Sequence, residues 1–190
     1  ILDLLNILFI FSGRTAMTVE RLPFLETLKD SYSAYYNINP NEDMTELPLV
    51  FRADFFSRGE HYFLTKSAVV WANETNEHVY LFSAPSFDAE TVEKCMDFAI
   101  EDAQPRVKPH KEHNYTNFIT IFVTDSFDAG TLSAIKKRRY NKSYNHSLWG
   151  FSMLKSAAVE LDTKKIHTNP AGHDLAKFYR KLFAAQEKKA

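Results

Sequence analysis

The densest group of chemically active side chains in this 190-residue chain is a basic segment, residues 136–142. It holds five cations, at Lys136, Lys137, Arg138, Arg139 and Lys142, with Tyr140 between them and Tyr144 close behind. Cations neutralise phosphates and aromatic rings stack on bases, so this composition predicts a site for nucleic acid or another polyanion. A second interpretation stays open: the segment is a solvated helix end, where cations also suit the negative pole of the helix dipole.

A pair of histidines, His110 and His113, lies in the stretch PHKEHNY. Two imidazoles at this spacing can bind one metal ion, and Glu112 between them could assist. A metal centre needs a third protein ligand, however, and no partner motif accompanies the pair. The segment is also not the helical H-E-x-x-H motif, so two histidines in a surface loop is the simpler prediction.

A third group consists of Asp54, Glu60, Lys66 and Glu77, on or beside the first three predicted strands. Together with the predicted element order αβββαβ over residues 23–124, these acids resemble the PD-(D/E)XK nuclease superfamily. The resemblance implies acidic ligands for Mg²⁺ and a lysine that assists the attacking water. No cofactor other than this Mg²⁺ is predicted for the chain.

The sequence departs from the nuclease pattern in two places. The third strand reads Glu77-His78-Val79, with valine where the lysine is expected, and no proline precedes Asp54. Lys66 comes from another strand and is only a weak substitute. The alternative interpretation treats these acids as exposed strand residues and turn formers.

The one cysteine, Cys95, excludes an internal disulfide and a cysteine-based zinc ribbon, which favours a reducing cytoplasm. It falls on the apolar stripe of a predicted helix, so we expect a small buried hydrophobe there. Nucleotide-binding glycine loops and the G-x-S-x-G motif do not occur. No run reaches the roughly 20 apolar residues of a membrane span.

These residues must be positioned by elements that hydrophobic periodicity and turn chemistry predict. The first part reads as a helix over 23–36, three strands with turns at 57–60 and 73–76, and a helix over 89–104 capped by Asp88. A central strand over 115–124, a helix capped by Asp128, strands at 143–153 and 155–162, and a last helix from Pro170 follow. The order αβββαβ-αββα predicts an α+β fold, a mostly antiparallel mixed sheet with packed helices.

No linker or repeat divides the chain, so residues 18–187 are predicted to form one domain. Residues 1–17 are predicted to be an N-terminal extension, non-native or a fragment end. The net charge of −1 hides an asymmetry: residues 1–104 carry seven Lys and Arg against 17 Asp and Glu, and residues 105–190 carry 16 against seven. The two halves could bind opposite partners or pair with each other within the fold.

Three stretches resemble an uncharacterised family of small bacterial proteins: YNKSYNHSLWGFS at 140–152, TNPAGHDLAKFYRKLF at 168–183 and FLTKSAVVWANETNEHVYLF at 63–82. The resemblance implies a bacterial cytoplasmic protein and transfers no catalytic residue. We therefore expect a protein that binds rather than one that catalyses. A metal-dependent nuclease-like domain is the alternative.

Overall fold

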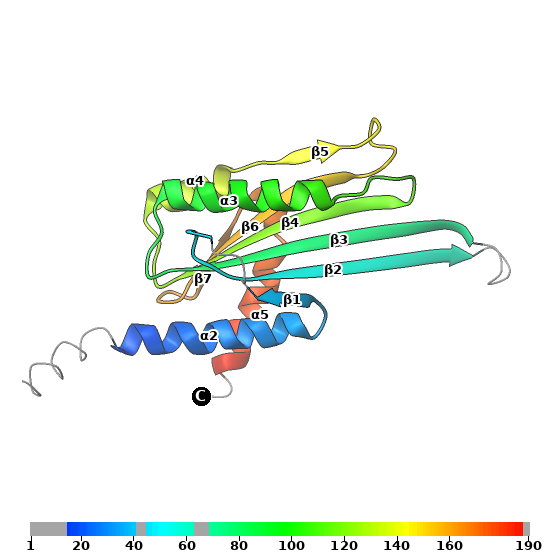
Figure 1. The fold of residues 1–190 in the computed structure, drawn as a ribbon. Helices are drawn as coiled ribbons and strands as arrows, with labels where there is room; N and C mark the ends of the chain where they lie inside the picture. The colour runs from blue at the N-terminus through cyan, green and yellow to red at the C-terminus, as the bar shows by residue number, and fades with distance from the viewer. Residues whose placement is uncertain (1–14, 41–44, 63–68, 188–190) are drawn as a thin grey trace, which may run out of the picture.

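A twisted mixed sheet with helices on both faces organises the chain (Figure 1). The computed structural model describes residues 15–40, 45–62 and 69–187. The seven strands of this part are β1 (Asn37–Pro40), β2 (Leu49–Tyr62), β3 (Val69–Ser83), β4 (His113–Thr124), β5 (Asn141–Ser143), β6 (Phe151–Glu160) and β7 (Lys165–Thr168).

The strand order is β1-β2-β3-β4-β6-β5, and β7 also pairs with β6. Strands β3, β4 and β6 run parallel in the centre, whereas β1, β2, β5 and β7 make the antiparallel pairings. The mixed sheet of an α+β protein is therefore confirmed. Strands β5 and β7 share the outer edge of β6 and leave a gap between them, opposite residues 154–156.

Four helices cover the sheet in the described part of the chain. The helices α2 (Thr15–Ser33) and α5 (Leu175–Glu187) lie on one face, and α3 (Ala89–Ala103) and α4 (Ala129–Lys137) on the other (Figure 1). Short 3₁₀ turns follow α3 at Gln104–Arg106 and precede α5 at Pro170–Gly172. None of the described helices has the length and apolar content to cross a membrane.

The two faces of the sheet build two separate cores, because successive strand residues point to opposite sides. On β4, Ile119, Ile121 and Val123 face α2 and α5, and Phe118 and Phe122 face α3 and α4. All of these side chains are at most 2% exposed. The prediction of a central strand here is confirmed, because both faces of β4 are buried, as expected for a central parallel strand.

The helix starts on the second face are set by aspartates, as predicted. Asp88 accepts a hydrogen bond from the amide of Thr91 at 2.7 Å, and Asp128 accepts from those of Gly130 and Thr131 at 2.7 and 3.0 Å. Such caps satisfy amides that have no partner within the helix. Cys95 on α3 is fully buried, and burial raises the pKa of its thiol to about 12.

Three strands precede α3, as the element order predicted, but their bounds differ: the three predicted strands are the two long strands β2 and β3, and β1 comes before them. Residues 57–60 and 73–76, predicted as turns, lie opposite each other in the β2–β3 ladder. Arg58 and Glu74 are partners in this register and form an ion pair. Polar turn formers are tolerated here because the two strands extend past the helices, where few side chains must be buried.

Several boundaries also differ from the predicted ones. The first helix starts at Thr15 and continues through Pro23, because Phe24 and Leu28 bury its apolar face in the core. The predicted strands at 143–153 and 155–162 are one strand, β6, with β5 and β7 beside it. Pro170 opens a 3₁₀ turn, and the last helix begins five residues later at Leu175.

Candidate functional site

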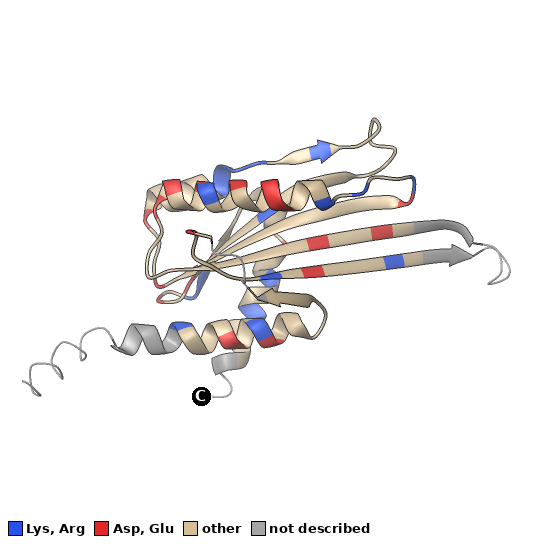
Figure 2. Ribbon diagram, viewed as in Figure 1, with Lys and Arg blue, Asp and Glu red and all other residues tan. Residues whose placement is uncertain are grey.

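The basic segment starts in the last turn of α4 and follows the chain into β5, along one edge of the sheet (Figure 2). Lys136, Lys137 and Lys142 are exposed. Arg139 folds back on the helix end, where its guanidinium donates to the carbonyl oxygens of Lys136 and Arg138 at 2.7 and 3.1 Å. These four cations of the basic segment form no ion pair with any other described residue. Their charge is therefore not neutralised by an acid in the described part of the chain.

Arg138 differs from its neighbours because its guanidinium pairs with Asp97 of α3. The side chains are 33% and 50% exposed, and an ion pair so accessible to water contributes little stability, at most about 1 kcal/mol. The acidic first half of the chain thus meets the basic segment at this residue. Internal pairing accounts for one of the five cations.

The two tyrosines of the segment are committed to the protein. The Tyr140 ring stacks on Phe118 with centroids 5.6 Å apart, and its hydroxyl donates to the Gln104 side chain. The Tyr144 hydroxyl shares a hydrogen bond of 2.9 Å with the Ser152 hydroxyl. The rings therefore position the segment against α3 and β6, and the base stacking predicted for them gains no support from this geometry.

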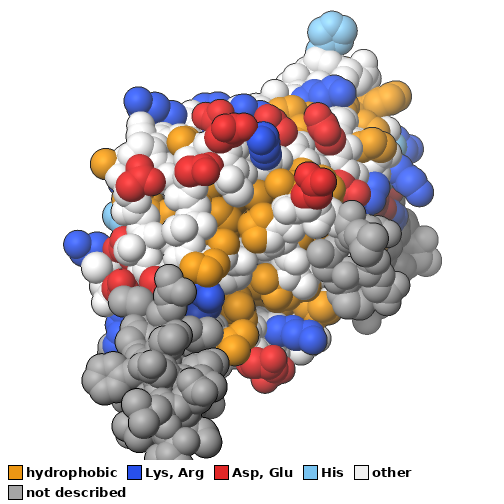
Figure 3. All heavy atoms as spheres, turned by 60° about the vertical axis from the view of Figure 1, so that its left-hand side comes forward, with side chains coloured by type: hydrophobic (Ala, Val, Ile, Leu, Met, Phe, Trp, Pro, Cys, Tyr) orange, Lys and Arg blue, Asp and Glu red, His pale blue; other side chains and the backbone are white. Residues whose placement is uncertain are grey.

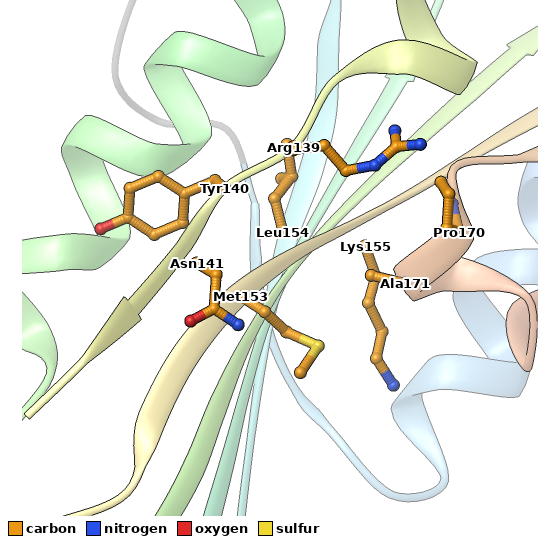
Figure 4. Close-up of a pocket in the computed structure, with 8 residues that line it drawn as sticks. All are labelled: Arg139, Tyr140, Asn141, Met153, Leu154, Lys155, Pro170 and Ala171. Atoms are coloured by element: carbon orange, nitrogen blue, oxygen red, sulfur yellow. The ribbon is translucent and has the colours of Figure 1, made fainter. Parts of the chain in front are cut away.

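A pocket of about 550 Å³ lies between the basic segment, β6 and the turn before α5 (Figure 4). Four apolar and four polar side chains line it: Arg139, Tyr140, Asn141, Met153, Leu154, Lys155, Pro170 and Ala171. In Figure 4 the Tyr140 ring turns away from the pocket, while Arg139 and Lys155 extend from opposite sides of it. The Lys155 ammonium also pairs with Asp174, at 2.7 Å.

Asn169 holds the walls of this pocket together and was not among the predicted residues. Its fully buried side chain fills the gap between β5 and β7. The Oδ1 atom accepts from the amides of Ser156 and Gly172 at 3.0 and 2.9 Å. The Nδ2 group donates to the carbonyl oxygens of Leu154 and Arg138 at 2.9 and 3.2 Å. Asn169 thereby replaces the missing ladder bonds and attaches the basic segment to β6.

More positive charge lies on β7, next to the end of α4. Lys165 is exposed, and the neighbouring His167 is partly buried. Burial lowers the pKa of His167, and the nearby charges of Lys136 and Lys165 lower it further, although Glu160 acts in the opposite direction. The same edge of the sheet thus carries unneutralised cations on both sides of the gap.

A second polar group lies on the α3 face of β2 and β3. Asp54 binds the His78 ring at 2.6 Å and the Arg106 guanidinium at 3.0 Å. The Arg106 guanidinium also forms an ion pair with Asp102, at 2.9 Å, and Asp102 accepts a hydrogen bond from the Tyr80 hydroxyl at 2.6 Å. Burial alone would raise the pKa of Asp54, but the hydrogen bond from His78 and the charge of Arg106 outweigh it, and the pKa lies below its ordinary value.

Glu77 lies on the opposite face of the sheet from Asp54. Asp54 is in register with His78, so the next residue of β3 points the other way. There the Glu77 carboxylate accepts from the Tyr36 hydroxyl and from the Asn117 amide, the latter at 3.0 Å. The structure does not bring these two acids together, so the convergence that the nuclease-like alternative requires is not found.

The other two residues of that alternative lie beyond what can be placed. Lys66 falls outside the described residues. Glu60 belongs to β2, but its side chain is outside the described set. In the part of the chain that is described, no three His, Cys, Asp or Glu side chains form a cluster that could hold a metal ion.

His110 and His113 have separate structural roles. His110 binds the Glu74 carboxylate at 2.9 Å. His113 is 4% exposed; its Nδ1 group donates to the carbonyl oxygen of Trp149 at 2.7 Å, and its Nε2 atom bonds the Thr116 hydroxyl at 2.9 Å. Because both ring nitrogens of His113 are occupied, the pair offers no shared metal site.

The comparisons with known proteins add a family. Residues 20–181 match the model of a family described as "Domain of unknown function (DUF8052)". The chain belongs to this family. The match runs from α2 to α5 and therefore takes in the basic segment, the pocket and Asn169. No curated protein and no solved structure matches the chain. Membership in an uncharacterised family, predicted from the three sequence stretches, is confirmed by this match.

Proposed function

We propose that this protein binds an anionic partner, nucleic acid or another polyanion, through the basic segment and the pocket beside it. The observation that carries the proposal is the unneutralised positive charge on one edge of the sheet, from Lys136, Lys137, Arg139 and Lys142. Of the five cations in the basic segment, only Arg138 has an acidic partner among the described residues. Clustered cations that no internal acid neutralises attract phosphates and release their counterions on binding.

The placement of the cations supports this proposal beyond their number. Lysines at a helix end suit the helix dipole, and lysines on edge strands prevent strand pairing, which would explain Lys137 or Lys142 individually. Arg139 and Lys155 instead extend from opposite sides of the pocket. An anion in this pocket would lie near Arg139, which has no acidic partner among the described residues, and near Lys155, whose ammonium also pairs with Asp174.

The test is equilibrium binding of labelled single-stranded and duplex oligonucleotides and of heparin, measured by fluorescence polarisation at increasing salt. We expect a linear log–log decrease, and the double variant Lys137→Ala/Arg139→Ala should flatten the slope by about 0.9 for each duplex phosphate contact that is lost. The matched control is Lys177→Ala/Arg180→Ala, which removes the same charge from exposed positions of α5. No binding at low salt, or an equal effect of the control, would contradict the proposal.

The nuclease-like alternative remains a prediction without a supporting observation. A Mg²⁺-dependent cleavage assay tests it directly, and the Asp54→Asn variant should abolish cleavage if the alternative is correct.

We also propose that the protein works in the bacterial cytoplasm, since its one cysteine cannot form an internal disulfide. Cell fractionation of the native host tests this location.

A further inference from the structure

The loop at residues 144–150, between β5 and β6, presents apolar side chains to solvent. We name it the tip loop, because it lies beyond the C-terminal end of α3 (Figure 1). Leu148 is 72% exposed and Trp149 is 41% exposed. Folded proteins rarely leave adjacent large apolar side chains uncovered without a use for them.

The backbone of the tip loop is strained. Three consecutive residues other than glycine, Asn145, His146 and Ser147, have positive φ angles of 46°, 53° and 69°. Each such residue costs of the order of 1 kcal/mol or more, and strained backbone is concentrated at functional sites.

The rest of the protein supports the loop in this conformation. The His113 ring, itself buried, donates to the Trp149 carbonyl oxygen at 2.7 Å. Gly150 has a φ of 71°, and a Cβ atom there would lie 2.2 Å from the carbonyl oxygen of Asn114. The chain closes on itself through bonds from the amides of Tyr144 and Trp149, at 3.0 and 3.2 Å. These contacts fix the backbone that carries the exposed apolar pair.

The charges at this end of the molecule are biased toward positive. Arg58 pairs with both Glu74 and Glu112, and its one positive charge offsets one of these two acids. The exposed Lys108 and Lys111, in the loop before β4 at the same end, form no ion pair with described residues. Lys142 lies next to the tip loop, with its ammonium 5.7 Å from the centroid of the Tyr144 ring.

We propose that the tip loop inserts Leu148 and Trp149 into the interfacial layer of an anionic lipid bilayer, while Lys142 and the neighbouring lysines contact lipid phosphates. The inference rests on the proposed function, because it names the anionic partner. Stable attachment to membranes takes two signals, such as an apolar insertion and a cluster of cations, and both are present here. Tryptophan favours the headgroup region, and anionic lipid attracts nearby lysines.

Leu148 favours a lipid surface over a nucleic acid, whereas the exposed Trp149 ring suits either partner. An aliphatic side chain such as Leu148 has no flat face on which a base could stack. The aromatic rings of the basic segment that could stack, Tyr140 and Tyr144, are turned into the protein instead. Exposed aliphatic surface next to free cations is the combination that a bilayer interface accommodates.

The experiment is co-sedimentation of the full chain with vesicles of phosphatidylcholine containing 30% phosphatidylserine, and with pure phosphatidylcholine vesicles. We expect binding to the anionic vesicles and a blue shift of tryptophan emission that the Trp149→Phe variant loses. Leu148→Ser should weaken partitioning about tenfold, because burial of a leucine contributes about that factor. Lys142→Ala should weaken it about fivefold. The matched control is Leu22→Ser, which removes an exposed leucine from α2.

Each outcome decides between the two proposals. Oligonucleotide binding without vesicle binding overturns the membrane inference and leaves the proposed function standing, whereas loss of both contradicts both. Vesicle binding that Leu148→Ser leaves unchanged also overturns the inference. If Leu148→Ser weakens oligonucleotide binding as much as vesicle binding, the tip loop contacts nucleic acid, and the inference is again wrong.

Discussion

Replacement of Asn169 by alanine should destabilise the protein more than any surface substitution in the basic segment. The side chain makes four hydrogen bonds to the backbone and is fully buried. Gly172 keeps a backbone bond to the Asn169 carbonyl oxygen, and the Arg138 carbonyl oxygen keeps the Arg139 guanidinium. The Ser156 amide and the Leu154 carbonyl oxygen lose their hydrogen bonds to the Asn169 side chain.

The magnitude follows from those two groups. A buried polar group left without a partner costs about 1–3 kcal/mol, so two cost about 2–6 kcal/mol, and we expect a loss near 3 kcal/mol for Asn169→Ala. A domain is typically stable by about 5–15 kcal/mol, so the variant should still fold. The basic segment should also detach from β6, with weaker anion binding as a result.

The assay is urea denaturation followed by circular dichroism, with the free energy of unfolding extrapolated to water. Asn141→Ala is the matched control: it removes the same amide from an exposed residue of β5 and should change stability by less than about 0.5 kcal/mol. A loss below about 1 kcal/mol for Asn169→Ala would refute the reasoning, because it would mean that water replaces the bonds to Ser156 and Leu154 at little cost.

Two further predictions concern backbone strain and pH. Gly150→Ala should lower the free energy of unfolding by several kcal/mol, because the new Cβ would lie 2.2 Å from the Asn114 carbonyl oxygen at a φ of 71°; unchanged thermal stability would contradict this. The lowered pKa of Asp54 stabilises the fold above the ordinary aspartate value, about 3.9, and this contribution disappears as the pH falls through the lowered pKa. The stability difference between wild type and Asp54→Asn should therefore be full near neutral pH and shrink in acid, as urea titrations at several pH values would show; a difference that does not depend on pH would contradict the assignment.

The parts of the fold that the sequence predicted well are those with an unbroken pattern. The α3 stripe and the continuous apolar run of β4 are visible in the sequence because every buried position is apolar. The long β2–β3 hairpin was misread because its outer half carries polar residues that also form turns, at 57–60 and 73–76. Pairing across the sheet, not local propensity, makes them strand residues.

The candidate site was predicted only where charge alone marks it. Five cations in one segment are visible in a sequence, whereas the role of Asn169 depends on partners 13 to 31 residues away. One signal was present: an asparagine directly before Pro170 suggests a capping residue at a turn. The opposite orientations of Asp54 and Glu77 could not be known without the strand register.

The reactivity of the buried Cys95 thiol reports the local opening of α3. Only a thiolate reacts readily with a disulfide reagent or an alkylating agent, and Cys95 is fully covered, with its pKa raised to about 12. Modification at neutral pH must therefore wait until α3 separates from the sheet. Because the chain has no second cysteine, the labelling rate of the unaltered protein measures how often that helix lifts away, and it does so without any engineered probe.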